Sequence, residues 1–446
     1  MTTIKWRIPV ALMAVTALAG CAALKGGGRK TPVLGERVPI LVSETDAKLE
    51  PAIAGLQVLL PAPVTNADWA QPGGNADRSL GHVALNSSVA RAWSVTIPAG
   101  TNRARLAATP VIADGKLFVV DINATLHAFQ ANSGTPLWTA PIAKSDKNKN
   151  SRFGGGASVD GGRVYAVDGL GDVVAFDATT GAQIWRAKPS AGGGALRGSP
   201  TVVGDQLYIL SQDNQLFALS TANGALLWSA SGSLESQGVF GVAAPAVAHN
   251  TIVAGFSSGE LNAYRAENGR ALWGDALSRT SITTSVSSLS DIDADPVIDD
   301  TRVYALGQGG RMVALDLSTG QRIWEQNFAG ISTPWLAGEW LFVVTDQSRL
   351  YCLQRSTGKV RWMTQLREFQ VEKKKKKKNP LTWYGPILAG GRLVLTSSMG
   401  EVAFVSPTDG TVGQVIENKV SFGLGPVVAN NTLYTLDERG RLNAYR

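Results

Sequence analysis

Short runs of apolar residues, separated by polar turns, recur along most of this chain. A representative stretch, residues 199–228, reads SPTVVGDQLYILSQDNQLFALSTANGALLW. Turn-forming residues divide it into short apolar or alternating segments, with turn signals about 8–12 residues apart. Segments of this length and pattern are typical of strands and not of helices. The stretch therefore predicts four consecutive strands.

The same unit occurs eight times. In six copies a glycine precedes a tryptophan by four residues, and the seventh copy has Gln414 in the place of that tryptophan. Four strands in a unit of roughly 40–50 residues indicate a blade of a β-propeller. We therefore predict an all-β fold, an eight-bladed β-propeller of four-stranded antiparallel blades. Seven blades is the alternative if the seventh copy is irregular. The copies span residues 109–138, 157–185, 199–228, 244–273, 295–324, 333–362, 385–414 and 425–446.

The eighth copy ends at Arg446, before its fourth strand. The stretch SVARAW, Ser88 to Trp93, matches the fourth-strand position of the other copies. We predict that this N-terminal strand completes the C-terminal blade and closes the ring. Closure of this kind removes two sheet edges that would otherwise promote aggregation.

The recurring tryptophan has a structural interpretation that we favour. A large flat ring at the same site in each blade can pack between adjacent sheets and against the glycine-rich turn. Glycine in that turn permits a positive φ and a close approach of the backbone. The alternative, a ligand cage built from these tryptophans, is less favoured.

The N-terminus has the parts of an export signal. Lys5 and Arg7 precede an apolar run, residues 8–17, that is too short to span a bilayer. The run ends in Leu-Ala-Gly before Cys21. We predict a signal peptide over residues 1–20.

The sequence Leu-Ala-Gly-Cys, residues 18–21, resembles the bacterial lipobox. In that family the cysteine sulfur takes up diacylglycerol, the signal is removed before the cysteine, and the new amine is acylated. The resemblance implies lipidation at Cys21, and several acyl chains anchor a protein stably. Ala22 stands where an inner-membrane lipoprotein has Asp, which implies the outer membrane. A plain signal peptide with an incidental cysteine is the alternative.

Residues 21–68 are predicted to be a lipidated tether and an N-terminal extension, and residues 69–446 the propeller domain. The stretches ERVPILV, residues 36–42, and GLQVLL, residues 55–60, suggest extra strands on the propeller's edge. Once Cys21 is lipidated, Cys352 has no partner within the chain, so we expect no disulfide.

The net charge of the chain is +7, and removal of Lys5 and Arg7 with the signal leaves +5. Lys373–Lys378 supply six of these charges, so the remainder is −1. A near-neutral body with one basic tract does not resemble a nucleic-acid-binding protein. We interpret the tract as a solvated open loop, or as a contact for anionic lipid headgroups or an acidic partner.

Catalytic and metal-binding patterns do not emerge. The three histidines fall in three different contexts along the chain, none near another and without metal-ligand spacing. The triple glycine at residues 154–156 is not followed by Lys-Ser/Thr and is not a P-loop. Three acids that precede the repeat turns are expected to cap those turns. We expect no enzyme, no metal and no cofactor. The residues concerned are His82, His127, His249, Asp177, Asp316 and Asp409.

The Gly-x-x-x-Trp pattern, with WAQPGGN at residues 69–75, resembles the pyrroloquinoline-quinone-like propeller repeat family. Its quinoprotein dehydrogenases use a quinone, a calcium ion and, typically, adjacent cysteines. This chain lacks adjacent cysteines and the long inter-blade insertions that build such an active site. The lipobox together with eight repeats resembles the BamB family of outer-membrane assembly lipoproteins.

Two inter-blade stretches carry this resemblance further: GALRGSP, residues 194–200, and SLSDIDADPV, residues 288–297. The corresponding loops of the family bind a periplasmic POTRA domain of the barrel-inserting subunit, BamA. The resemblance implies partner-binding roles for four residues, although Gly194 and Ile292 replace a Leu and a Val of the family pattern. These four are Leu196, Arg197, Asp291 and Asp293.

Leu196 offers an apolar anchor for such a partner, and Arg197 can form a bidentate pair with a partner carboxylate. Alternatively, Arg197 pairs with Asp291 or Asp293 and only ties two loops together.

The resemblance implies a non-catalytic scaffold lipoprotein of the β-barrel assembly machinery, on the periplasmic face of the outer membrane. It would bind BamA and assist the folding and insertion of outer-membrane β-barrel proteins. A further hypothesis is that strand edges bind unfolded substrates. A quinone-dependent dehydrogenase and a propeller that binds another envelope protein remain the alternatives.

Overall fold

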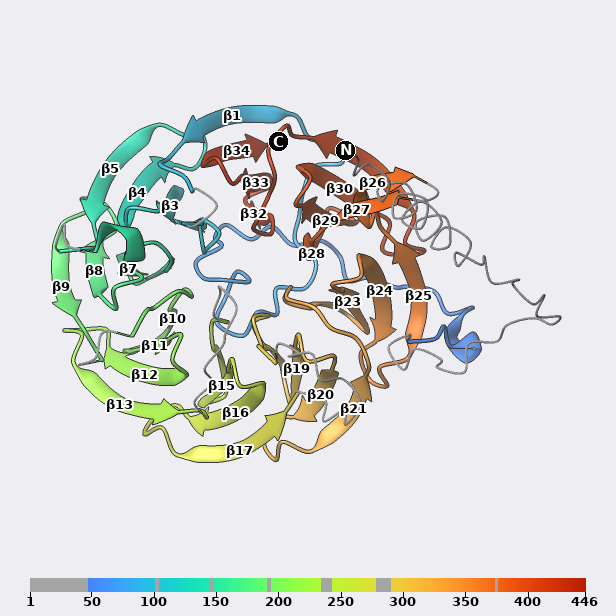
Figure 1. The fold of residues 1–446 in the computed structure, drawn as a ribbon, viewed down its shortest axis with the longest axis horizontal. Helices are drawn as coiled ribbons and strands as arrows, with labels where there is room; N and C mark the ends of the chain where they lie inside the picture. Colours follow the sequence, from blue (N-terminus) through green and yellow to red (C-terminus); the bar gives the residue numbers. More distant parts are fainter. Residues whose placement is uncertain are drawn as a thin grey trace, which may run out of the picture. The chain divides into compact units, whose positions relative to one another are not determined.

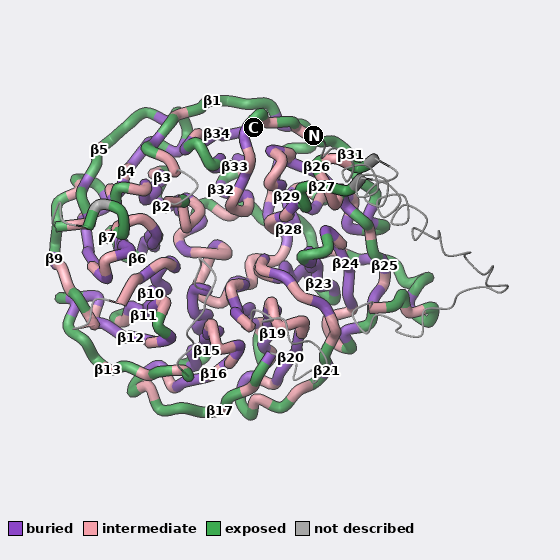
Figure 2. Tube along the Cα trace, in the orientation of Figure 1, coloured by how far each residue is buried: buried purple, intermediate pink, exposed green. Residues whose placement is uncertain are grey.

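The computed structural model describes residues 47–100, 104–144, 148–190, 194–233, 243–277, 290–373 and 376–446. Eight four-stranded antiparallel sheets are arranged around a central axis (Figure 1). The prediction of an eight-bladed propeller is confirmed, and the seventh copy forms a regular blade. Within each blade the first strand is innermost and the fourth lies at the rim, and the buried residues concentrate between these layers (Figure 2).

The strands follow the repeats in chain order. Blades 1 to 4 contain β2 (Val111–Ala113), β3 (Lys116–Val120), β4 (Thr125–Gln130), β5 (Pro136–Pro141), β6 (Ala157–Asp160), β7 (Arg163–Val167), β8 (Val173–Asp177), β9 (Gln183–Ala187), β10 (Thr201–Val203), β11 (Gln206–Leu210), β12 (Gln215–Ser220), β13 (Leu226–Ser231), β14 (Ala246–Ala248), β15 (Thr251–Gly255), β16 (Glu260–Arg265) and β17 (Ala271–Ala276). Blades 5 to 7 contain β18 (Val297–Asp299), β19 (Arg302–Leu306), β20 (Met312–Asp316), β21 (Arg322–Gln326), β22 (Trp335–Ala337), β23 (Trp340–Val344), β24 (Arg349–Gln354), β25 (Val360–Gln365), β28 (Trp383–Ala389), β29 (Arg392–Ser397), β30 (Glu401–Val405) and β31 (Val412–Glu417). Two short 3₁₀ helices are η1 (Pro51–Ile53) and η2 (Lys149–Ser151).

Blade 8 joins the two ends of the chain. It consists of β32 (Val427–Ala429), β33 (Thr432–Leu436), β34 (Arg441–Tyr445) and the N-terminal strand β1 (Arg91–Thr96), which pairs with β34. Ala90 and Arg446 exchange two backbone hydrogen bonds, of 2.7 and 2.9 Å, where the two termini of the blade meet. The predicted closure is confirmed, with the strand about three residues later than the stretch SVARAW suggested.

The repeat tryptophans pack between neighbouring blades, as predicted. Trp324 of blade 5 covers Gly358 in the turn between β24 and β25, and its indole N–H donates to the Arg355 carbonyl at 2.8 Å. The same indole-to-carbonyl bond into the next blade, at 2.7–3.2 Å, is made by Trp93, Trp185, Trp228, Trp273 and Trp362.

Gln414 in blade 7 has a physical explanation. In every other blade the tryptophan covers the turn between the third and fourth strands of the next blade. Blade 8 has no such turn, because its third strand ends at the C-terminus and its fourth strand comes from residues 91–96. A tryptophan at position 414 would therefore have no glycine turn to cover.

Gly358→Ala is expected to lower the free energy of unfolding by about 2 kcal/mol, because strain at positive φ and overpacking add. Gly358 has φ +71°, and an added Cβ would lie 2.6 Å from two carbons of the Trp324 indole. The matched control is Gly162→Ala, which has φ +74° but open space around its Cβ. Urea denaturation should show a larger loss for Gly358→Ala, and equal losses would contradict the packing role.

A segment that precedes the first blade closes one end of the central channel. Residues 66–85, here the ring segment, bind the first strand of each blade in turn (Figure 1). For example, Trp69 exchanges hydrogen bonds of 2.7 and 2.9 Å with Ile112 in blade 1, and the Ala76 carbonyl accepts from Val247 in blade 4 at 2.9 Å. The chain thus ties together the inner strands of blades that lie far apart in the sequence.

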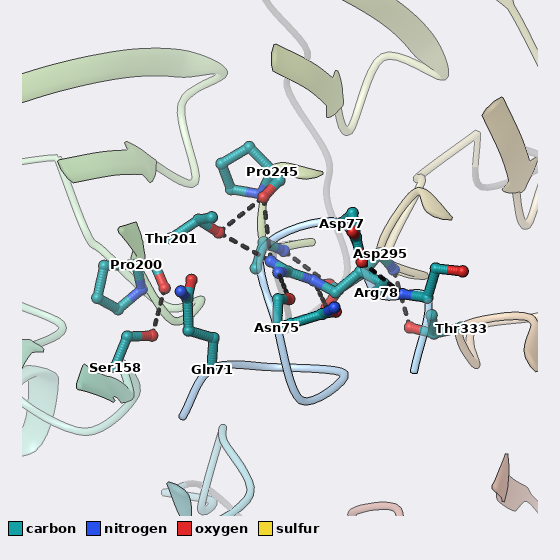
Figure 3. A network of polar contacts seen from close by, with 12 residues as sticks. Gln71, Asn75, Asp77, Arg78, Ser158, Pro200, Thr201, Pro245, Asp295 and Thr333 are labelled. Carbon is teal, nitrogen blue, oxygen red and sulfur yellow. Dashed lines mark hydrogen bonds and ion pairs between the residues drawn. The ribbon is translucent and has the colours of Figure 1, made fainter. Parts of the chain in front are cut away.

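Arg78 occupies the centre of the ring segment and is 1% exposed. Its guanidinium donates to Asp295 at 3.3 Å, to the Thr201 hydroxyl at 2.8 Å and to the Pro245 carbonyl at 3.0 Å (Figure 3). Burial lowers the pKa of Arg78, and the charge of Asp295 opposes that shift. One side chain therefore links the connections that lead into blades 3, 4 and 5.

Two expectations about segments outside the repeats are wrong. Residues 55–60 form no strand, because the chain pairs with the outer strand β25 only at Leu49–Val360 and then turns towards the ring segment. The described lysines of the tract lie in a two-stranded hairpin, β26 (Phe369–Lys373) and β27 (Lys376–Pro380), and not in an open loop. The Glu368 carboxylate oxygen Oε2 lies 3.4 Å from Lys377 Nζ and supplies a negative charge at the base of the hairpin. The stretch ERVPILV lies outside the described residues.

Candidate functional site

The two stretches singled out by resemblance lie on one face of the propeller. Residues 194–200 connect blade 2 to blade 3, and residues 290–296 connect blade 4 to blade 5. In an antiparallel blade these connections share an end of the sheet with the turn between the second and third strands. We call this side the connector face. The ring segment also reaches the opposite side, at the turns between the first and second strands, where the Asp114 amide donates to Asp68 at 3.0 Å and the Gly390 amide donates to the Val83 carbonyl at 2.9 Å. We call this side the plugged face.

Arg197 is held in place by groups from blades 2 and 3. Its guanidinium lies 4.5 Å from the centroid of the Phe153 ring, donates to the Phe153 carbonyl at 3.0 Å and donates to the Gln212 side chain at 2.7 Å. Burial lowers the pKa of this guanidinium from its usual value. A half-buried, oriented arginine loses little further side-chain entropy when it binds a carboxylate, and arginine is enriched at interface hot spots.

The triple glycine makes room for Arg197. A Cβ at Gly154, which has φ +100°, would lie 3.2 Å from the arginine Cγ and 3.3 Å from Nη1. Phe153, Gly154 and Gln212 are thus supporting residues that the sequence analysis missed. The Gly-Gly-Gly run directly after an aromatic residue was the signal available for them.

Leu196 is not an exposed apolar anchor. It is 1% exposed and packs in the interface between blades 2 and 3 with Tyr165, Val167 and Val202. Its amide donates to the Asp168 carbonyl at 3.2 Å. The core between these blades already takes up this side chain, so the expected role is corrected: Leu196 positions Arg197 and offers no apolar surface to a partner.

The two acids differ in exposure. Asp291 is 2% exposed, and its carbonyl accepts from the Gln308 amide at 2.9 Å. Asp293 is half-buried, and its carboxylate accepts from the Gln308 side chain at 2.5 Å. Burial, and then the charge of Asp291, raise the pKa of Asp293 to about 6. Asp293 is therefore the more accessible of the two acids.

Arg197 and Asp293 each have local partners in their own pair of blades. Gln212 and Phe153 hold the arginine, whereas Gln308 holds the acid. The connection between blades 3 and 4 lies between the two stretches around the ring. Each group is thus oriented by contacts with its own neighbouring blades.

Both stretches line a central cavity of about 770 Å³. Gly198 and Ser199 contribute from one connection, and Asp293 and Asp295 from the other. The ring segment contributes Trp69, which stacks on Trp335 with 6.0 Å between centroids. Of the four candidate residues, Asp293 lines this cavity itself, and Arg197 directly precedes the lining residue Gly198.

The other chemically notable residues have structural partners. His82 is buried and bonds to the Pro61 carbonyl at 2.7 Å and the Gly391 amide at 2.8 Å. His127 lies on β4 and contacts Asp121 at 2.9 Å. Within the described ranges, three or more His, Cys, Asp or Glu side chains nowhere gather as they would around a metal ion.

The acids expected to cap turns do so. Asp177, Asp316 and Asp409 each accept a backbone N–H two residues on, at 3.0 Å. Cys352 is completely buried on β24, and burial raises the pKa of its thiol. Cys21 lies outside the described residues, and no helix within them is long and apolar enough to span a bilayer.

Comparisons of the sequence with known proteins indicate one family. The family model described as outer membrane protein assembly factor BamB matches residues 79–147 and 123–364. The protein of that name from Yersinia pestis is 26% identical over 365 residues, which cover 80% of this chain and 89% of the relative. The Escherichia coli K12 protein is 28% identical over 346 residues, covering 77% and 85%.

Solved structures share the fold. BamB from Moraxella catarrhalis superposes with a TM-score of 0.67 at 18% identity, covering 80% of this chain and all of that one. A quinohemoprotein alcohol dehydrogenase from Comamonas testosteroni reaches 0.66 at 12% identity, covering 85% and 80%. At these identities, structural likeness extends to the fold alone.

Proposed function

Because the chain belongs to the BamB family of outer membrane protein assembly factors, we propose that it is a non-catalytic accessory protein of β-barrel assembly at the periplasmic face of the outer membrane. The match to the family model across residues 79–364 carries this proposal. The named relatives, which align over more than three quarters of the chain, support it.

The partner in this proposal is a periplasmic POTRA domain of BamA. The orientation of Arg197 by Phe153 and Gln212 supports a role in recognising a carboxylate on that partner. Asp293, beside the central cavity, supplies a complementary acceptor for a partner cation or N–H group. Leu196 and Asp291 are buried and set the positions of their neighbours. Cys21 is proposed as the site of the lipid anchor.

Arg197→Ala is expected to weaken binding of BamA about 30-fold, the loss typical of an interface hot-spot arginine. The measurement is recovery of BamA from detergent-solubilised envelopes with this protein as bait, followed by titration of purified BamA. Asp293→Asn is expected to weaken binding in the same direction. Arg270→Ala is the matched control, because Arg270 is an exposed arginine in the turn between β16 and β17 on the plugged face.

If Arg197→Ala and Arg270→Ala recover BamA equally with the native bait, the proposed site is wrong but the assembly role stands. If the native bait recovers no BamA, the proposed partnership itself is wrong. The circular dichroism spectrum of each variant should match that of the native protein, because both arginines lie outside the blade cores.

A further inference from the structure

The rim of blade 6 combines two kinds of surface that the proposed role in assembly does not use. One is the lysine hairpin β26–β27, which leaves the rim directly after β25. The other is the described N-terminal chain, which pairs with the start of β25 at Leu49–Val360. β25 is six residues long, so it brings the two features to opposite ends of one short strand (Figure 1).

The hairpin is strongly basic for its size. The sequence places six consecutive lysines, residues 373–378, in this connection, while the rest of the mature chain carries a net charge of −1. Lys377 and Lys378 are exposed, and Lys377 lies 5.0 Å from the centroid of the Phe369 ring. Flexible lysine side chains act as point charges without shape selectivity, which suits a diffuse anionic surface better than one defined carboxylate.

Apolar side chains are unusually exposed in the described N-terminal chain, part of which reaches the start of β25. Leu59, Val64 and Leu49 are 73%, 67% and 57% exposed, the highest values among the large apolar residues that the structure describes. Leu49 and Leu56 lie against β25, where the Arg361 side chain donates to the Leu56 carbonyl at 2.8 Å. In Figure 2 the tube is largely green, the colour of exposed residues, along the stretch that lies against the outer side of β25.

Exposed leucines at one end of β25 and clustered lysines at its other end together give this rim the composition of an interfacial surface. Apolar side chains can enter the boundary between headgroups and acyl chains, while lysines contact the lipid phosphates. An acidic protein surface would match the lysines but would leave the leucines in water. The combination therefore favours a bilayer over an acidic protein as the occupant of this rim.

We propose that the rim of blade 6, formed by the β26–β27 hairpin and the exposed leucines of residues 49–59, binds a bilayer surface that carries anionic phospholipid headgroups. This inference rests on the proposed location at the outer membrane. Arg197 and Asp293 lie in other connections, between blades 2 and 3 and between blades 4 and 5, so binding through blade 6 leaves both residues accessible to the protein partner. The contact supplements the lipid at Cys21 and orients the propeller edge-on to the membrane.

The test is co-sedimentation of the full mature chain, carrying Cys21→Ser so that no lipid is attached, with unilamellar vesicles. The vesicles contain equal parts of phosphatidylglycerol and phosphatidylcholine, or phosphatidylcholine alone. Lys377→Gln/Lys378→Gln is expected to reduce partitioning to the anionic vesicles about 25-fold, at roughly fivefold per lysine. The matched control is Lys144→Gln/Lys188→Gln, two exposed lysines in the connections that flank blade 2, across the ring.

Leu49→Ser/Leu56→Ser is expected to remove the binding that persists at high salt, where charge interactions are screened. The proposal is overturned if the anionic vesicles bind no more protein than the neutral vesicles. It is also overturned if Lys144→Gln/Lys188→Gln reduces partitioning to the anionic vesicles as much as Lys377→Gln/Lys378→Gln does. If the hairpin variant loses BamA while its vesicle binding is unchanged, the hairpin binds an acidic protein and the membrane proposal is wrong.

These outcomes are distinct from failure of the proposed function. A protein that recovers BamA but ignores anionic vesicles keeps its assembly role and loses the proposed membrane-binding rim.

Discussion

Arg78→Ala is expected to lower the free energy of unfolding by about 3–5 kcal/mol, the loss that follows when one partner of a buried ion pair is removed. The substitution leaves the Asp295 carboxylate without its cation, and burial already raises the pKa of that acid. The Thr201 hydroxyl and the Pro245 carbonyl lose a donor at the same time. The midpoint of urea unfolding, followed by tryptophan fluorescence, measures the loss.

A second variant separates the charge from the linkage. Arg78→Met/Asp295→Asn removes both charges and keeps comparable volume, so it is expected to be much less destabilised than Arg78→Ala. The asparagine side chain would retain an acceptor for the Ala244 amide, which in the native protein donates to Asp295 at 2.7 Å. If the double variant is as unstable as Arg78→Ala, the missing hydrogen bonds of Arg78, and not the unpaired acid, dominate the loss.

The propeller itself could be predicted because its information is local and repeated. Each copy carries its own strand pattern, and six of the eight also carry the glycine turn with its tryptophan, so several weak signals reinforce one another. The Gln414 exception also has a local cause once the ring closure is known. The N-terminal strand, residues 91–96, could be predicted to complete the last blade because the last copy lacks its fourth strand.

The ring segment could not be predicted in the same way. Residues 66–85 have no strand periodicity, and their partners lie far away along the chain: Gln71 bonds to Val202, 131 residues on, and Arg78 to Asp295, 217 residues on. Nothing local signals such contacts.

The candidate site shows a related limit. A resemblance identified Leu196, Arg197, Asp291 and Asp293 together, but it carried no information about exposure. Short connections between blades have no alternation from which burial can be inferred, so the inward direction of Leu196 and Asp291 emerged only from the packing of the blades. The residues that orient Arg197 come from a different connection and a different turn.

The stability of this protein is expected to rise when the pH falls from about 7 to about 4, and Asp168→Asn is expected to remove about 3 kcal/mol of that gain. Asp168 is fully buried, and burial raises the pKa of its carboxyl to about 6. Two backbone amides, of Leu170 and Asp172, donate to Oδ1 at 2.9 Å, but no donor among the described residues reaches Oδ2.

The direction follows from proton binding. In the unfolded chain this carboxyl titrates near pH 3.9, so between about pH 4 and 6 the folded protein holds the extra proton. The stabilising effect of that proton is therefore greatest below this range, falls as the pH rises through it, and is absent above it. Asparagine keeps the acceptor for both amides but carries no charge, so Asp168→Asn should be more stable than the native protein at neutral pH. Asp293, whose pKa is raised to about 6, contributes in the same direction.

Asp316→Asn provides the matched control, because the environment of Asp316 shifts its carboxyl pKa in the opposite direction. Hydrogen bonds from Ser318 and then Thr319 lower the pKa of this half-buried acid to about 2. Its stabilising effect is present above about pH 4 and is lost as the pH falls towards 2, so its replacement should give no gain at neutral pH. Urea unfolding of the native protein, Asp168→Asn and Asp316→Asn at several pH values between 4 and 7 measures how the free energy of unfolding of each depends on pH. If the free energy of unfolding changes between pH 4 and 6 as much in Asp168→Asn as in the native protein, the burial of Asp168 does not govern the pH dependence.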